Sequence, residues 1–148
     1  MTARPIVLLL HGPNLNLLGD REPHIYGTTT LQDHVDRVRK LCDDAGFDLE
    51  DLQSNAESEL VDAVQRARKR VAAIIVNAGA LTHYGWSLHD ALAAYDGVVV
   101  EVHLSNTGRR EPWRHTSVLT PVSKGTITGL GPDGYEFATE ALMRLLHD

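Results

Sequence analysis

Short apolar runs separated by amphipathic stretches constrain the fold of this chain most strongly. Residues 6–10 and 72–76 form uninterrupted apolar runs, and residues 98–102, apolar except for Glu101, form a similar run that continues into His103. A strand covered by helices on both faces has this continuous pattern, whereas a strand with one face in water alternates. Residues 47–52 and 124–128 have strand-like patterns too, so the sequence predicts five strands.

The segments between these runs have helical spacing. Thr30 with Asp33, and Ser54 with Glu57, form possible capping boxes at two helix starts. A third helix is predicted over residues 84–95, and a fourth follows residue 133. Strands that alternate with helices indicate a parallel sheet with right-handed crossovers. We therefore predict an α/β, flavodoxin-like three-layer sandwich, with a five-stranded parallel sheet of order 2-1-3-4-5 and helices on both faces.

Length and charge limit the class of protein. A chain of 148 residues fits one domain, residues 1–148. The net charge of -6 disfavours nucleic acid and anionic membranes as partners. The single cysteine, Cys42, excludes an internal disulfide and fits a reducing compartment. The apolar run at residues 6–10 is too short to span a membrane. We therefore expect a cytoplasmic protein with no nucleic-acid or membrane partner.

Polar side chains follow the three strands that the predicted order places side by side. Asn14 follows the first strand, Asn77 ends the third, and Glu101, His103 and Ser105 share one face if the fourth strand continues. Ligands bind beyond the carboxyl ends of such strands, so we expect a pocket there. Glu101 and His103 could hold a metal, but no third ligand is evident. A carboxylate that orients an imidazole is the simpler interpretation.

The glycine-bounded segment 19–27 follows the first strand and has the composition of a lid. It would bring Arg21 and Tyr26 to the pocket.

Nucleophilic catalysis is disfavoured, because Cys42 lies in the middle of an apolar helix face and no nucleophile elbow is present. The residues therefore favour acid–base chemistry.

Five segments of the chain resemble the type II 3-dehydroquinate dehydratases, also called type II dehydroquinases. They are GPNLNLLGDREPHIYG (residues 12–27), NAGALTHYGWSLHDAL (77–92), EVHLSN (101–106), REPWRH (110–115) and GLGPDGY (129–135). The resemblance covers nearly the whole chain. It implies a flavodoxin-like lyase that converts 3-dehydroquinate to 3-dehydroshikimate by anti elimination of water through an enolate. It also implies no cofactor, no metal and no covalent imine.

The resemblance assigns roles to individual residues. Tyr26 would be the base that removes the C2 proton, and His103 the acid that protonates the departing C1 hydroxyl. Asn14 would stabilise the enolate, Arg21 would hold Tyr26 in its reactive form, and Glu101 would orient His103. The substrate oxygens would be held by Asn77, His83, Leu104, Ser105 and Arg114.

Further roles concern the lid and the assembly. The resemblance assigns Arg110 and Glu22 to the lid and its support. It implies a dodecamer built from trimers, in which Asp90 would reach the site of a neighbouring subunit. The pathway would be the shikimate route to aromatic amino acids or the breakdown of quinate.

Two other interpretations remain open from the residues. A flavin- or nucleotide-binding module needs a phosphate-cradling first loop, which Pro13 disfavours because it removes a backbone donor. The second is a catalytically inactive oligomeric relative. Such a protein would have no need to keep the four residues assigned to the reaction, which are Asn14, Arg21, Tyr26 and His103. For single residues, Arg21 and Arg114 could be surface charges, and Asp90 could be an ordinary capping partner of Ser87.

Overall fold

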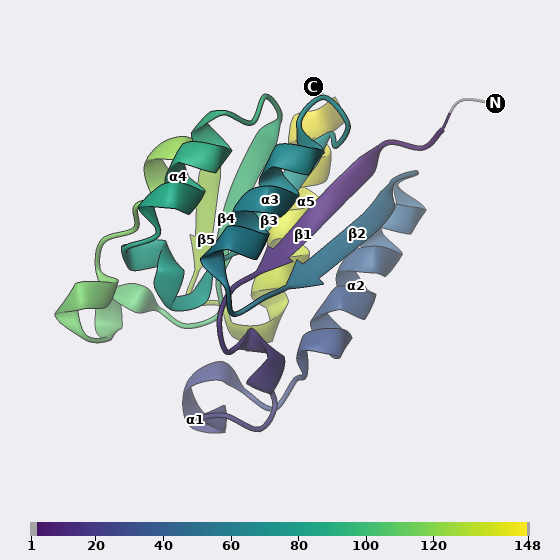
Figure 1. Cartoon of the computed structure of the whole chain (residues 1–148). Helices are drawn as coiled ribbons and strands as arrows, with labels where there is room; N and C mark the ends of the chain where they lie inside the picture. The colour runs from purple at the N-terminus through teal and green to yellow at the C-terminus, as the bar shows by residue number, and fades with distance from the viewer. Residues whose placement is uncertain (1–2, 148) are drawn as a thin grey trace.

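The computed structural model describes residues 3–147 and contains a five-stranded parallel sheet (Figure 1). The strands lie in the order β2-β1-β3-β4-β5, which confirms the predicted order. Their bounds are β1 (Ile6–His11), β2 (Asp48–Gln53), β3 (Ala73–Asn77), β4 (Val98–His103) and β5 (Gly125–Thr128).

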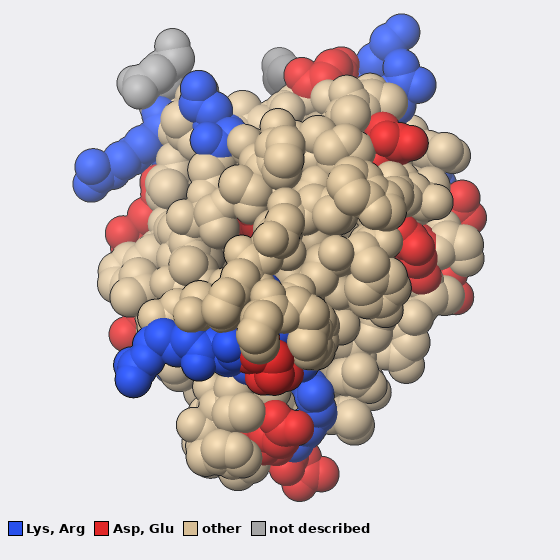
Figure 2. Space-filling model, turned by 90° about the vertical axis from the view of Figure 1, so that its left-hand side faces the viewer, with Lys and Arg blue, Asp and Glu red and all other residues tan. Residues whose placement is uncertain are grey.

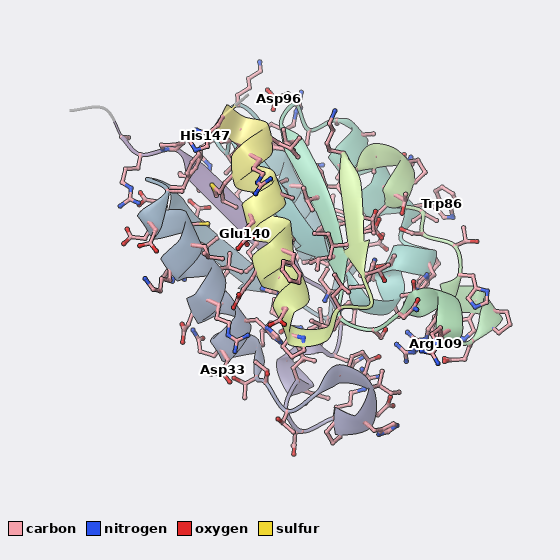
Figure 3. All side chains as sticks on the ribbon, turned by 180° about the vertical axis from the view of Figure 1, so that it is seen from behind. Asp33, Trp86, Asp96, Arg109, Glu140 and His147 are labelled. Atoms are coloured by element: carbon pink, nitrogen blue, oxygen red, sulfur yellow. The ribbon has the colours of Figure 1, made fainter. Side chains whose placement is uncertain are left out.

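Helices cover both faces of the sheet. On one face lie α2 (Leu31–Asp44) and α5 (Gly134–His147), which Figure 3 shows in front of the strands. On the other face lie α3 (Glu57–Ala67) and α4 (Trp86–Ala93). The short helix α1 (Pro23–Tyr26) belongs to neither layer and lies below the carboxyl ends of the strands in Figure 1. Within the described residues, no helix is both long enough and apolar enough to cross a membrane.

Alternate residues of the central strands fill two separate cores. Val7, Leu9 and Ile75 pack on the side of α2 and α5. Leu8 and Ile74 pack on the side of α3 and α4. Because the central strands bury both faces, they read as continuous apolar runs rather than alternating ones.

One predicted capping box is confirmed and the other is wrong. Thr30 Oγ1 accepts from the backbone N–H of Asp33, and Asp33 Oδ2 accepts from that of Thr30, both at 3.1 Å. In contrast, α3 has Ala56 as its N-cap, without a side-chain cap. The Glu57 carboxylate instead accepts from the backbone N–H of Leu88 at 3.1 Å. The carboxylate therefore gives a hydrogen-bond acceptor to the first turn of α4, whose free N–H groups favour a nearby negative charge.

The predicted helix over residues 84–95 is shorter than expected. A 3-10 turn, Gly79–His83, precedes it, and α4 itself begins at Trp86. The backbone at the end of β1 lies against this region, because the N–H of Gly12 donates to the carbonyl of Asn77 at 2.8 Å. A Cβ atom at position 12 would collide with the carbonyl of Ala78. Glycine is therefore required where the two strand ends meet.

Candidate active site

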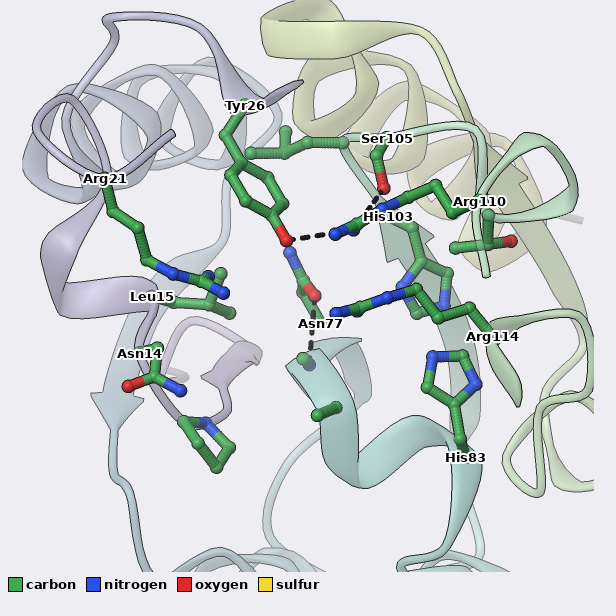
Figure 4. Close-up of a pocket in the computed structure, with 15 residues that line it drawn as sticks. Asn14, Leu15, Arg21, Tyr26, Asn77, His83, His103, Ser105, Arg110 and Arg114 are labelled. Atoms are coloured by element: carbon green, nitrogen blue, oxygen red, sulfur yellow. Dashed lines mark hydrogen bonds between the residues drawn. The ribbon is translucent and has the colours of Figure 1, made fainter. Parts of the chain in front are cut away.

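A pocket lies at the carboxyl edge of the sheet, beyond β1, β3 and β4 (Figure 4). Its empty volume, including the open mouth, is about 520 Å³, which suits a small molecule. Among the described residues, three arginines and no carboxylate line it. The lining residues are Pro13, Asn14, Leu15, Arg21, Tyr26, Asn77, Gly79, Ala80, His83, His103, Leu104, Ser105, Thr107, Arg110 and Arg114. The pocket therefore suits an anionic ligand.

The segment 19–27 brings Tyr26 into the pocket, where its side chain is buried. Arg110 Nη1 donates to Tyr26 Oη at 2.9 Å and to Ser105 Oγ at 3.1 Å (Figure 4). The guanidinium carbon of Arg21 lies 5.2 Å from the centre of the Tyr26 ring, as does that of Arg110. Two guanidinium groups thus flank this tyrosine. The hydrogen bond to its hydroxyl comes from Arg110, whereas the resemblance named Arg21 as the partner of Tyr26.

Arg114 is held from two sides at the mouth of the pocket. Its Nε donates to Glu111 Oε2 at 2.9 Å, and its guanidinium carbon lies 4.0 Å from the centre of the Trp113 ring. His83 contacts the edge of the same ring, and its Nδ1 lies 2.7 Å from the carbonyl of Thr116. Partial burial lowers the pKa of His83 although this hydrogen bond opposes the shift. A neutral imidazole and a fixed cation therefore lie next to each other.

His103 ends β4 and is hydrogen-bonded to Glu101, two residues earlier on the same strand face. Its Nε2 lies 2.6 Å from Glu101 Oε2. The Glu101 carboxylate is 1% exposed and also accepts from Ser117, Thr120 and Thr126.

These contacts decide the ionisation state of Glu101. Burial raises the pKa of the carboxyl, but the hydrogen bonds and the charge of His103, with the bonds from Thr120 and Ser117, outweigh it and lower the pKa to about 2. Glu101 is therefore an anion that fixes the orientation of the imidazole. Within the described residues, Nδ1 of His103 has no hydrogen-bond partner and is the ring nitrogen left for a ligand.

Asn14 lines the pocket from the loop after β1, and Asn77 lines it from the end of β3. Asn14 has a left-handed backbone, with φ of 69°, which asparagine tolerates better than most residues. Its backbone N–H donates to Asn55 Oδ1 at 3.0 Å. Asn77 Nδ2 donates to Tyr135 Oη at 3.1 Å, and its Oδ1 accepts from the N–H of Gly79 at 3.3 Å. Asn14 is therefore held through its own backbone N–H, and Asn77 is held through its side chain.

Three of the predicted residues do not line this pocket. Glu101 lies behind His103, beside a second cavity of about 340 Å³ that shares His83, His103, Thr107 and Arg114 with the first. Glu22 precedes α1, where its Oε1 lies 3.9 Å from Arg21 Nη2. Asp90 lies on α4 with its side chain 86% exposed.

Ser105 reaches the pocket by a route other than the expected one. The sequence placed it on one strand face with Glu101 and His103, but β4 ends at His103. Ser105 belongs to the following turn, where its carbonyl accepts from Thr128 and its hydroxyl from Arg110.

Sequence reasoning missed several residues at the site. Thr107 lines both cavities, Asn55 holds the backbone of Asn14, and Tyr135 holds the Asn77 amide. The position of Asn55, two residues after the end of β2, was an available signal for it. Among the described residues, no group of three or more His, Cys, Asp or Glu side chains is arranged to hold a metal ion.

Comparisons with known proteins agree with this geometry. Residues 5–143 match the model of the family described as dehydroquinase class II. A 3-dehydroquinate dehydratase of Tolumonas auensis is 50% identical over 146 residues, which cover 99% of this chain and 96% of that relative.

Solved structures give the same result. The crystal structure of a type II dehydroquinase from Butyrivibrio crossotus has a TM-score of 0.91 at 38% identity, covering 95% of this chain and 99% of that one. A type II dehydroquinase from Propionibacterium acnes also gives 0.91 at 38% identity, covering 97% and 99%. The chain therefore belongs to the dehydroquinase class II family.

Proposed function

We propose that residues 1–148 act as a single catalytic domain, a 3-dehydroquinate dehydratase that converts 3-dehydroquinate to 3-dehydroshikimate. The observation that carries this proposal is the meeting of two groups in one cationic pocket. Tyr26, with its hydroxyl 2.9 Å from Arg110, and His103, paired with Glu101, both line it. One group suits removal of a proton from carbon and the other suits protonation of a leaving hydroxyl.

Tyr26 is the proposed base for the C2 proton. A tyrosine hydroxyl is a weak base unless its anion is stabilised, since a free tyrosine ionises only near pH 10. The guanidinium of Arg110 donates to Tyr26 Oη, and Arg21 lies over the ring. Both guanidinium groups are positively charged and lie beside the side chain that would take up the proton. We assign Arg110 the direct contact, with Arg21 supplying a second nearby charge and Glu22 supporting the lid.

His103 is the proposed acid for the C1 hydroxyl. The ionised Glu101 accepts a hydrogen bond from Nε2 of His103 and keeps that nitrogen engaged. The proton would leave from Nδ1, the ring nitrogen without a partner among the described residues. The step breaks the C1–O bond and forms water, while the enolate electrons form the new C=C bond.

The remaining pocket residues suit binding of an anionic, hydroxylated substrate. Asn14 would stabilise the enolate oxygen, since preorganised donors at such an oxygen contribute roughly 3 kcal/mol each. The fixed guanidinium of Arg114 suits a carboxylate or a hydroxyl of the substrate. The other proposed contacts to substrate oxygens come from Asn77, His83, Leu104 and Ser105.

We further propose a dodecamer made of four trimers, in which Asp90 contacts the site of a neighbouring subunit. Figure 2 shows that the side of the molecule formed by α4 and its neighbours has few charged side chains over its centre. Trp86 on this side is 62% exposed, and Figure 3 shows it pointing outward. Exposed apolar groups of this kind support self-association. Light scattering after size-exclusion chromatography gives the assembly mass, and a monomer would contradict this proposal.

The proposed setting is the cytoplasm, in the shikimate pathway or in quinate breakdown. The lone cysteine, Cys42, is buried and free, which supports a reducing compartment.

The decisive assay follows the ultraviolet absorbance of the conjugated enone product after addition of 3-dehydroquinate. A parallel sample contains borohydride, which traps covalent imines. A rise that survives borohydride is expected, because the mechanism uses no imine. No rise from folded, assembled protein would contradict the proposed function and favour the binding-module interpretation, for which tight flavin or nucleotide binding is the positive signal.

A further inference from the structure

Tyr135 is fully buried and makes hydrogen bonds that the proposed mechanism does not use. It lies in the first turn of α5. Its hydroxyl is 3.1 Å from Asn77 Nδ2 and 3.1 Å from His11 Nδ1. His11 and Asn77 end β1 and β3 and are register partners in the sheet. The tyrosine therefore joins the ends of two strands directly beneath the pocket.

The donors and acceptors around Asn77 and Tyr135 indicate the direction of each hydrogen bond in this group. The backbone N–H of Gly79 can only donate, so Asn77 Oδ1 accepts from it, as Figure 4 shows. The amide nitrogen of Asn77 then faces Tyr135 and donates to Oη. Tyr135 has one hydrogen of its own to donate, and His11 Nδ1 lies 3.1 Å away as its acceptor when that nitrogen carries no proton. One chain of hydrogen bonds thus runs from Gly79 through Asn77 and Tyr135 to His11.

The chain requires a neutral His11 with its proton on Nε2. Burial, with a smaller contribution from the charge of His34, lowers the pKa of His11 to about 3, so the ring is neutral near pH 7. Nε2 has no partner among the described residues, so Nδ1 is the ring nitrogen that is engaged. The ring of His34 packs against Tyr135 with 4.7 Å between centroids and limits movement of the tyrosine.

We propose that Tyr135 and His11 are positioning residues that hold the Asn77 carboxamide in one orientation for substrate binding. This inference rests on the proposed function, because it takes Asn77 as a substrate contact. With Oδ1 engaged by Gly79 and one N–H by Tyr135, Asn77 offers the pocket its second N–H as a fixed donor. Without Tyr135, the 3.3 Å hydrogen bond from Gly79 is left alone to hold the amide, and a rotated amide would present its oxygen to the substrate instead.

The kinetic test is a double-mutant cycle with Tyr135→Phe and Asn77→Ala. Tyr135→Phe should lower kcat/KM roughly fivefold, about the effect of one neutral hydrogen bond. Most of the loss should appear in KM, because substrate binding rather than chemistry is weakened. In the Asn77→Ala background, Tyr135→Phe should change kcat/KM less than about twofold, because the residues act through one interaction. An undiminished fivefold loss in that background overturns the inference.

Tyr95→Phe is the matched control. Tyr95 is also buried and donates its hydroxyl to the carbonyl of Val71 at 2.6 Å, away from the pocket. The control should lose stability but keep kcat and KM. A change in KM as large as that of Tyr135→Phe would mean that loss of any buried tyrosine hydroxyl disturbs the site, and would overturn the inference.

A measurement on the unmodified protein decides the hydrogen-bond chain even if Tyr135→Phe does not fold. Nitrogen NMR of labelled histidine distinguishes the two neutral tautomers. The chain requires the proton of His11 on Nε2, and a proton on Nδ1 overturns it. This result does not depend on turnover. A protein without dehydratase activity but with the expected tautomer would contradict the proposed function and leave the hydrogen-bond chain intact.

Discussion

Acid should destabilise the fold through two buried histidines, His11 and His34, before it protonates the carboxylates. Burial, with a smaller contribution from Arg37, lowers the pKa of His34 from 6.5 to about 4. Burial also lowers the pKa of His11 from 6.5 to about 3. Both rings are fully buried. The unfolded chain therefore binds protons at these two residues below pH 6.5, whereas the folded chain does not until the pH is far lower.

The magnitude follows from proton linkage. For each pH unit below 6.5, a histidine that stays neutral only in the folded state reduces the free energy of unfolding by about 1.4 kcal/mol. At pH 5 the loss is about 2 kcal/mol for each histidine, or about 4 kcal/mol for the pair. That is a large part of the roughly 5–15 kcal/mol that stabilises a typical domain. The stabilising ionisation of Glu101, with its pKa of about 2, is lost only below pH 4.5.

The assay is urea unfolding at pH 7, 6 and 5, followed by circular dichroism at one protein concentration, since assembly also contributes stability. His34→Gln removes one titrating ring. Whatever its stability at pH 7, the free energy of unfolding of the variant should fall by about 2 kcal/mol less than that of wild type between pH 7 and pH 5. His147→Gln, at an exposed histidine near the end of α5, is the control and should follow wild type. Equal pH dependence in wild type and His34→Gln would refute the reasoning.

Three shorter predictions concern the site and its support. Tyr26→Phe should lower kcat by roughly 100-fold or more, the usual contribution of a general base, with KM little changed; steady-state kinetics that show near-normal turnover would exclude Tyr26 as the base. Glu101→Gln should lower kcat and reduce the free energy of unfolding in urea by about 1–3 kcal/mol, because an amide cannot accept from all four donors that bind the carboxylate. A fully active and equally stable variant would argue against the orienting role of Glu101. Gly12→Ala should give little folded protein on a size-exclusion column, because the added methyl group meets the Ala78 carbonyl; a normal yield with normal activity would contradict the close approach of the two strand ends.

The sequence predicted the fold well because the fold depends on local patterns. Continuous apolar runs marked the buried strands, and the Thr30 capping box is complete within four residues. Glu57 shows the limit of such patterns. It stands at the right spacing from Ser54, but it accepts from Leu88 on the next helix, a partner that no local pattern reveals.

The candidate site was predictable in outline because strand order determines which loops meet. Its detailed contacts depend on packing between distant segments. The bond between Arg110 and Tyr26 spans 84 residues, and nothing local to either residue favours Arg110 over Arg21 as the partner. Tyr135 looks like one more apolar position on the face of α5. Only its position beneath Asn77 shows that its hydroxyl is engaged.

Among the residues that the structure describes, no acidic group lines the pocket, and this affects how the protein must be handled in solution. A chain of net charge -6 concentrates three guanidinium groups around one small cavity. Phosphate, sulfate and citrate ions will compete for these cations, so buffers that contain them should raise the apparent KM without changing kcat. Ionic strength alone should slow capture of an anionic substrate, because salt screens charges beyond about 8 Å at physiological concentration. Kinetic constants for this protein are therefore comparable only when the buffer anion and the salt concentration are the same.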